Sequence, residues 1–353
     1  MILESFAAAA VSEAIGALAS SAVGAAGTQL IKTVLANRQD LARKLALRQR
    51  DLAVQMSRLN AALEGTFRVY HFRPGMPAVV WDDLGDYDSE IIEMAKRLRA
   101  DSCYPPHGEN RSHALAYPED IETNQLAHEV RATRSDFATV MAMRSRGERP
   151  RVLSANVLLF DPQDRSLILH HRSRKSATGA GSLHFFGGNY EPPSKPAPND
   201  ASLHECALRE LYEETRLKLE VPEHSLVLAG EETDTGFVQF TYVAVALGKD
   251  SKPRAHAGEG QIERYPIAAV LNYARGAPHA LHGRRSRISP TGEPLDTTML
   301  DSCLGTIVMW LLLGAPDEDF RTPWAEEAQK LGEEMLAALE VNRNEEIGDA
   351  GAP

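Results

Sequence analysis

The stretch that decides the fold reads GGNYEP at residues 187–192 and RELYEE at residues 209–214. Apolar side chains recur every three or four residues around the second part, which predicts a helix. At about 100° per residue, Glu210, Glu213 and Glu214 fall within one arc of about 100° on that helix. The opposite side of the helix is apolar, so the three carboxylates border a core.

Three carboxylates on one helical turn repel one another, and the i,i+3 and i,i+4 pairs each cost roughly 0.2–0.5 kcal/mol. A divalent cation removes that cost, and Mg²⁺ prefers carboxylate oxygens while leaving positions open for phosphate oxygens. Arg209 can orient a carboxylate through paired hydrogen bonds. The pair Gly187-Gly188 ends the preceding strand, where a backbone without Cβ can approach a ligand closely. The pattern predicts a cation site, and a solvated acidic face is the alternative.

The surrounding sequence alternates between strands and helices without a strict strand–helix–strand repeat, which indicates an α+β protein or an α-β-α sandwich. β-branched and apolar runs predict strands at 152–160, 166–172, 183–186 and 237–247. Helical spacing predicts helices at 202–218, about 297–313 and about 323–341.

The two quoted elements resemble the Nudix box, a GG…E element followed by REUxEE in which U is aliphatic. The resemblance covers roughly residues 150–315 and implies an α-β-α sandwich with the box as loop-helix-loop. It implies hydrolysis of a nucleoside diphosphate linked to another moiety, using Mg²⁺ or Mn²⁺. Glu210, Glu213 and Glu214 fall on the family's metal-ligand positions, and Arg209 falls on its orienting arginine.

The chain departs from the family pattern at three places. Gly188 falls on the first glycine of the box, but an insertion around 194–200 adds about seven residues before the arginine. Ala201 stands where the family has a glutamate, which removes one acid near the metals. Arg216 stands where a glycine closes the helix, so that turn must be built differently. These departures motivate an alternative function, a nucleotide-binding sensor with a catalytically weak domain.

Hydrolysis of a pyrophosphate bond requires an attacking water, a base and neutralisation of the charge on two phosphates. Cations held by the three glutamates would lower the pKa of the water. The base is one of these glutamates, such as Glu213 or Glu214, or an acid from a later loop. Glu259 is the loop candidate, because glycines on both sides allow its loop to swing toward the metals. An exposed loop acid is the alternative interpretation of Glu259.

Other polar residues near the box carry a weaker signal. The histidines on the predicted strands, His170, His171 and His184, are interpreted as ordinary half-buried side chains. Basic residues in two clusters are candidates for phosphate contact or simply solvated loop residues: Arg172, Arg174 and Lys175, and Arg284, Arg285 and Arg287.

Composition limits the class of protein. The 353 residues include 38 basic and 49 acidic side chains, and a net charge of −11 argues against stable nucleic-acid binding. Three cysteines without a CxxC pair argue against a disulfide framework or a cysteine zinc site. The Ala-rich beginning contains Glu4 and Glu13, so neither a signal peptide nor a transmembrane helix is expected there. We expect a cytoplasmic protein that acts on a small nucleotide.

The chain is expected to comprise four segments. The spacing of apolar residues in 1–65 predicts a helical hairpin with a basic side. The hairpin is expected to pack on itself or on a second copy of the chain, and the alternative is that it lies on an anionic membrane surface. Residues 66–148 form an α/β segment of no evident function, in which 108–120 reads as loop. Residues 149–315 form the Nudix-like domain, and 316–353 an acidic C-terminal helix and tail.

Overall fold

The computed structural model describes residues 50–71, 78–81, 87–101, 112–116, 129–172, 181–191, 200–221, 226–233, 236–245, 260–276, 298–313 and 323–350. The chain divides into two compact units, residues 1–55 and 56–353. Residues 50–62 are helical, but most of the predicted N-terminal hairpin lies outside the described residues. Its oligomerisation or membrane contact, and the segment boundaries at 65, 148 and 315, therefore stay predictions.

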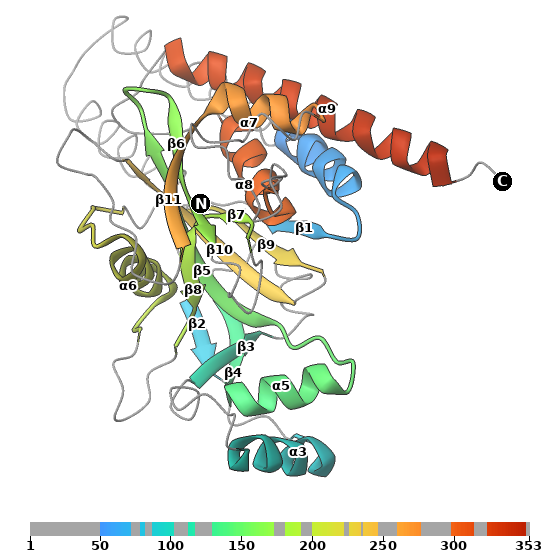
Figure 1. Ribbon diagram of the computed structural model, residues 1–353, viewed down its shortest axis with the longest axis vertical. Coiled ribbons are helices and arrows are strands. Elements are labelled where there is room, and N and C mark those ends of the chain that lie inside the picture. The colour runs from blue at the N-terminus through green and yellow to red at the C-terminus, as the bar shows by residue number, and fades with distance from the viewer. Residues whose placement is uncertain are drawn as a thin grey trace, which may run out of the picture. The chain divides into compact units, whose positions relative to one another are not determined.

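A sheet centred on β5 (Val152–Asp161) organises the second unit, and all ten residues of β5 are buried. β10 (Phe237–Val245) pairs with β5 in parallel, and β8 (Phe186–Asn189) and β6 (Ser166–Arg172) pair with it antiparallel. The strand order is β1-β9-β10-β5-β3-β4-β2, while β11 and β7 pair with β6 (Figure 1). The sequence-predicted strands at 152–160, 166–172 and 237–247 thus correspond to β5, β6 and β10.

The remaining elements have these bounds: β1 Phe67–His71, β2 Ala78–Trp81, β3 Ser112–Ala116, β4 Glu129–Asp136, β7 Leu183–His184, β9 Leu226–Glu232, β11 Gly260–Pro266, α3 Ser89–Ala100, α5 Phe137–Ser145, α6 Leu203–Thr215, α7 Ile267–Ala274, α8 Asp301–Leu312 and α9 Pro323–Ala350.

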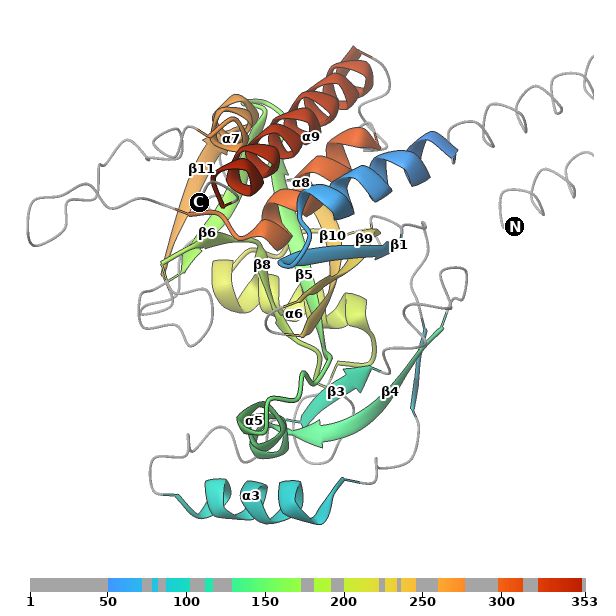
Figure 2. The ribbon, with the colours of Figure 1, turned by 90° about the vertical axis from the view of Figure 1, so that its right-hand side faces the viewer.

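Helices cover both faces of the central strands, which gives helix–sheet–helix layers with mixed α+β content (Figures 1 and 2). Alternate β5 side chains such as Leu153 and Val157 pack with Leu211 and its neighbours on α6. From the other face of β5, Phe160 contacts Trp310 on α8, with 4.9 Å between the ring centroids. Because successive strand residues point to opposite faces, β5 is buried by α6 on one side and by α8 on the other.

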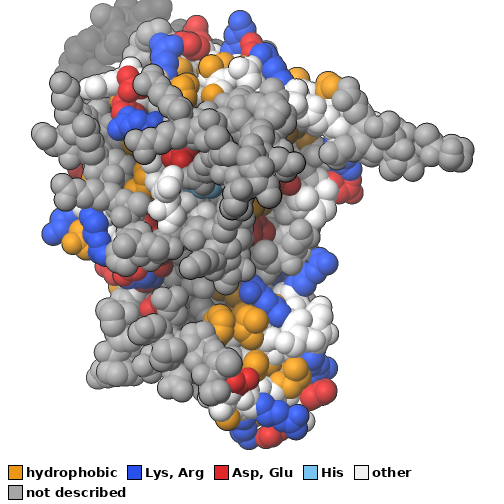
Figure 3. Space-filling model, in the orientation of Figure 1, with side chains coloured by type: hydrophobic (Ala, Val, Ile, Leu, Met, Phe, Trp, Pro, Cys, Tyr) orange, Lys and Arg blue, Asp and Glu red, His pale blue; other side chains and the backbone are white. Residues whose placement is uncertain are grey.

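Strands β2, β3 and β4 belong to the same sheet as β5. β3 pairs with β4 and touches β5 through Leu115 and Val152. The interpretation of 108–120 as loop is wrong over β3, because pairing on both sides stabilises a strand whose short Ser/His/Ala sequence has no strong local signal. α3 and α5 bury a small apolar cluster of their own, and α3 carries interspersed acidic and basic side chains outside it (Figure 3).

The C-terminal helix α9 is tied to the rest of the unit by packing and by ion pairs. Gly332 lies against the α8 backbone, where an added Cβ would be 2.8 Å from the Leu312 nitrogen. Arg58 donates two hydrogen bonds to Glu340, at 2.8 and 2.6 Å. Within the described ranges, no helix combines the length and the apolar character that crossing a membrane requires.

Candidate functional site

Helix α6 begins after a residue whose side chain accepts a hydrogen bond from one free amide of the first turn. Ser202 is the N-cap, and its hydroxyl oxygen accepts the Glu205 N–H at 3.1 Å. Glu205 in turn accepts the Ala201 N–H at 2.8 Å. Such reciprocal bonds fix the start of a helix. Because the helix starts at a fixed residue, the direction in which each of its side chains points is also fixed, and the acidic side chains face the end of β8.

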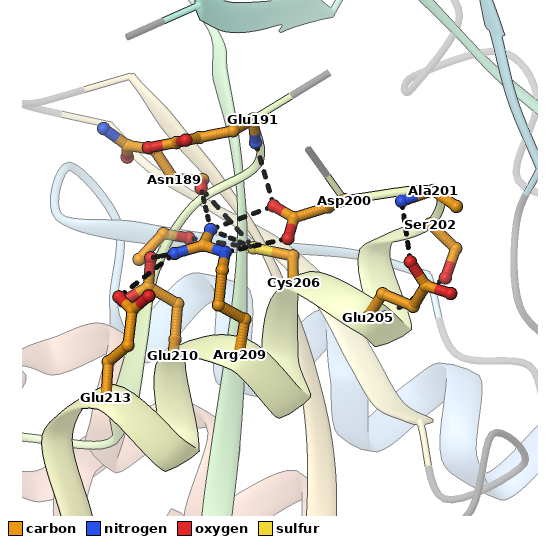
Figure 4. A network of polar contacts seen from close by, with 11 residues as sticks. Asn189, Glu191, Asp200, Ala201, Ser202, Glu205, Cys206, Arg209, Glu210 and Glu213 are labelled. Atoms are coloured by element: carbon orange, nitrogen blue, oxygen red, sulfur yellow. Dashed lines mark hydrogen bonds and ion pairs between the residues drawn. The ribbon is translucent and has the colours of Figure 1, made fainter. Parts of the chain in front are cut away.

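Arg209 is the centre of the acidic cluster (Figure 4). Its guanidinium donates two bonds to Asp200, at 2.8 and 2.9 Å. The same group contacts Glu210 at 2.7 Å and Glu213 at 3.3 Å. A further bond of 3.2 Å reaches the Asn189 carbonyl at the end of β8. One arginine therefore joins two predicted cation ligands to the strand that ends in the glycine pair.

Asp200 is a site residue that the sequence interpretation missed. It lies one residue before Ala201 and is only 3% exposed, while the side chain of its partner Arg209 is 21% exposed, so the carboxylate end of this ion pair is buried. It also accepts the Glu191 N–H at 3.1 Å, while its own N–H donates to the Glu191 carbonyl. These bonds join the two ends of the inserted stretch. The sequence offered one signal for this role, because Asp200 is an acidic residue directly next to Ala201, where the family pattern has a glutamate.

Glu210 is largely buried, with a side chain that is 16% exposed, and it lies against Gly188. A Cβ added at Gly188 would lie 2.4 Å from a Glu210 carboxylate oxygen, so any other residue here would displace the carboxylate from its present position. Burial raises the pKa of Glu210 to about 7; Arg209 opposes the rise and the neighbouring Glu214 adds to it. A cation bound next to this carboxylate would stabilise its ionised form and lower its pKa.

Glu214 is held by partners that differ from those of the other two glutamates. One oxygen accepts the Gly187 N–H at 3.1 Å. The other lies 3.3 Å from Nδ1 of His170, a β6 residue that the sequence interpretation left outside the site. Gly187 itself fits tightly, because a Cβ there would be 2.1 Å from the Asn156 side chain. Both glycines of the predicted pair thus border carboxylates of the cluster.

The candidate base Glu259 lies outside the described residues. Gly260, which follows it, begins β11 and is in the described part. A Cβ added at Gly260 would lie 2.7 Å from Nε2 of His170. Among the basic candidates, Arg172 is at the end of β6; the others, Arg174, Lys175, Arg284, Arg285 and Arg287, lie outside the described residues.

The donor set suits a hard cation. Among the described residues, no three His, Cys, Asp or Glu side chains are already arranged around one point as metal ligands. The cause is visible in the contacts, since Arg209 bridges Glu210 and Glu213 while Glu214 faces Gly187 and His170. Carboxylate oxygens on one helical turn are nevertheless the ligands that Mg²⁺ and Mn²⁺ accept. The chemistry of the donor set therefore fits such an ion, while in this structure Glu210 and Glu213 contact Arg209.

The turn after α6 shows how the chain replaces the missing glycine. Arg216 is the C-cap with φ 61°, a left-handed conformation, and its N–H donates to the Tyr212 carbonyl at 2.8 Å. Its guanidinium lies 5.6 Å from the centre of the Tyr212 ring. The backbone geometry is the one that glycine favours, and a cation–π contact accompanies the arginine that adopts it.

Arg216→Gly is expected to stabilise the protein by about 1 kcal/mol, because glycine adopts the left-handed conformation without the Cβ penalty. Urea denaturation of the two proteins measures the difference. Arg216→Ala is the control, because it removes the Tyr212 contact and keeps the Cβ. Its free energy of unfolding should not exceed that of the wild type. A loss of stability in the glycine variant would show that the ring contact outweighs the backbone cost.

Comparison with known proteins gives one family match. Residues 150–283 match the family model described as NUDIX domain. No curated protein matches the chain. Solved structures that resemble it include the MutT protein of Methanosarcina mazei Go1, at 20% identity and a TM-score of 0.29, covering 35% of this chain and 83% of that one. Another is the NUDIX domain of Shewanella oneidensis NrtR complexed with ADP ribose, at 20% identity and a TM-score of 0.28, covering 36% and 80%.

Proposed function

The chain is a member of the Nudix superfamily of hydrolases through residues 150–283, and we propose that it hydrolyses the phosphoanhydride bond of a nucleoside diphosphate linked to another moiety. The observation that carries the proposal is the cluster around Arg209, which gathers two predicted ligands at the end of β8. Asp200 supplies a carboxylate beside Arg209, so the absence of a glutamate at position 201 leaves no gap there. This weakens the reason for considering a non-enzymatic sensor.

We assign the roles of the cluster from burial and contacts. Mg²⁺ or Mn²⁺ held by Glu210, Glu213 and Glu214 would neutralise phosphate charge and lower the pKa of the attacking water. The Glu213 side chain is 53% exposed and can meet a substrate that arrives from solvent. The Glu210 side chain is 16% exposed and sits against the backbone of Gly188. Arg209 orients Glu210 and ties α6 to the end of β8.

We propose Glu259 as the general base. Two contacts of described residues support this: Gly260 lies against His170, and His170 lies against Glu214. Glu259 precedes Gly260 in the sequence, and the glycines on both sides of it favour a loop that can move toward the cations. Glu213 and Glu214 are the competing candidates, and Glu259→Gln distinguishes them by the loss of kcat with cation binding retained.

The test of the proposed function is a product screen with the full-length protein. Nucleotide sugars, ADP-ribose and dinucleoside polyphosphates are incubated with Mg²⁺, and products are identified by mass spectrometry. We expect two phosphate-ending products from at least one compound, and no products when EDTA replaces Mg²⁺. A folded preparation that cleaves none of these compounds would overturn the proposal.

The pKa of Glu210 predicts a pH-dependent effect of Mg²⁺ on stability. Without a cation this pKa is about 7, against an ordinary value of 4.5. The stability that the group contributes is therefore full below about pH 4.5 and is lost as the pH rises through about 7, by up to about 3 kcal/mol. Mg²⁺ binds the ionised form, so it should raise the melting temperature more at pH 8 than at pH 5.

Thermal unfolding with and without Mg²⁺ at the two pH values measures this difference. Glu210→Gln is the control, because an amide does not titrate. In this variant the rise in melting temperature caused by Mg²⁺ should differ less between pH 8 and pH 5 than it does in the wild type. An equal or larger gain at pH 5 would contradict the prediction.

A further inference from the structure

We propose that His170 is a positioning residue, which fixes the direction of the Glu214 carboxylate; this rests on the function proposed for the site. His170 is 4% exposed, and Nδ1 lies 3.3 Å from the nearer Glu214 oxygen. The two groups are not aligned as a hydrogen bond, and Nδ1 has no such partner in the described part of the chain.

The imidazole is held on its sides by the fold. Its ring stacks on Phe186, with 5.9 Å between centroids and 9° between planes. In the β6–β7 pairing His170 stands directly opposite His184, another buried imidazole. Gly260 lies at the Nε2 edge so closely that a Cβ would approach to 2.7 Å. These contacts restrict the ring, so Nδ1 keeps its place beside Glu214.

A buried nitrogen without a hydrogen bond costs about 1–3 kcal/mol. A small rotation of the Glu214 carboxylate removes that cost when the proton is on Nδ1. The second Glu214 oxygen already accepts the Gly187 N–H. Two donors from two strands, the β8 amide and the β6 imidazole, then define the plane of the carboxylate. Hydrogen bonds to a ligating carboxylate commonly contribute 10–100-fold to metal affinity or activity.

The same residue lies between Glu214 and the beginning of β11. Its Nδ1 edge faces α6 and its Nε2 edge faces Gly260, the neighbour of Glu259. Its role is orientation, and it is not itself assigned a proton transfer.

Two substitutions separate this role from simple packing. His170→Asn retains an amide donor near the place of Nδ1 but loses the ring that stacks on Phe186. His170→Phe retains the ring and loses the donor. Mn²⁺ binding by the substrate-free protein is measured by isothermal titration calorimetry, and kcat and KM are measured separately.

We expect His170→Phe to weaken Mn²⁺ binding about 10–100-fold and to lower kcat more than it changes KM. We expect His170→Asn to bind Mn²⁺ more tightly than His170→Phe. His204→Phe is the matched control, because His204 is a buried α6 histidine that bonds the Val221 carbonyl and lies outside the cluster. It should leave Mn²⁺ binding unchanged.

Wild-type Mn²⁺ affinity in His170→Phe, or a weaker affinity in His170→Asn than in His170→Phe, would overturn the positioning role. The calorimetric comparison does not depend on turnover. A wild-type protein that binds Mn²⁺ but cleaves no compound would therefore count against the proposed function alone.

Discussion

Glu210→Gln is expected to lower kcat at least ~10²-fold, the scale seen when a strong electrostatic stabiliser is removed from an active site. The side chain keeps its shape between Gly188 and Arg209, so the loss is one of charge rather than packing. Glu213→Gln is expected to act in the same direction. Steady-state kinetics over a range of Mg²⁺ concentrations measures kcat and the activation constant together.

Glu205→Gln is the matched control for this prediction. Glu205 belongs to the same helix but bonds the Ala201 N–H at its beginning, away from the Arg209 cluster. A glutamine oxygen can accept that bond, so kcat should stay close to the wild-type value. Unchanged turnover in Glu210→Gln and Glu213→Gln would remove the basis for the proposed cation site.

Arg209→Met is expected to destabilise the protein by about 3–5 kcal/mol, because it leaves a buried carboxylate without its partner. Asp200 is 3% exposed and receives two of the guanidinium bonds. Glu210 loses a contact at the same time, although its raised pKa lets it take up a proton. Urea denaturation at pH 7 gives the difference in the free energy of unfolding.

Two further variants make this stability prediction specific. Arg275→Met removes an ion pair with Glu334 whose side chains are 51% and 35% exposed, and exposed pairs contribute about 0–1 kcal/mol. In the Arg209→Met background, Asp200→Asn should recover part of the loss, since it removes the stranded charge. If Arg209→Met and Arg275→Met lower the free energy of unfolding equally, the Asp200–Arg209 pair contributes no more to stability than an exposed ion pair.

Local sequence was sufficient for the elements that carry the site. The spacing of Glu210, Glu213 and Glu214 predicted that the three side chains lie on the same side of a helix, because the helical period alone fixes the direction of each side chain. The long apolar runs predicted the central strands β5, β6 and β10 for the same kind of reason. β3 was missed, because its pairing partners stabilise it more than its own side chains do.

The sequence by itself determined that α6 presents three carboxylates and an arginine after a glycine-ended strand. Only the tertiary structure decided which groups those side chains meet. Asp200 reaches Arg209 because the inserted stretch closes on Glu191, and His170 reaches Glu214 because β6 lies next to β5, which pairs with β8. Contacts between distant segments depend on strand order and on loop closure, and neither is encoded in the periodicity of any one segment.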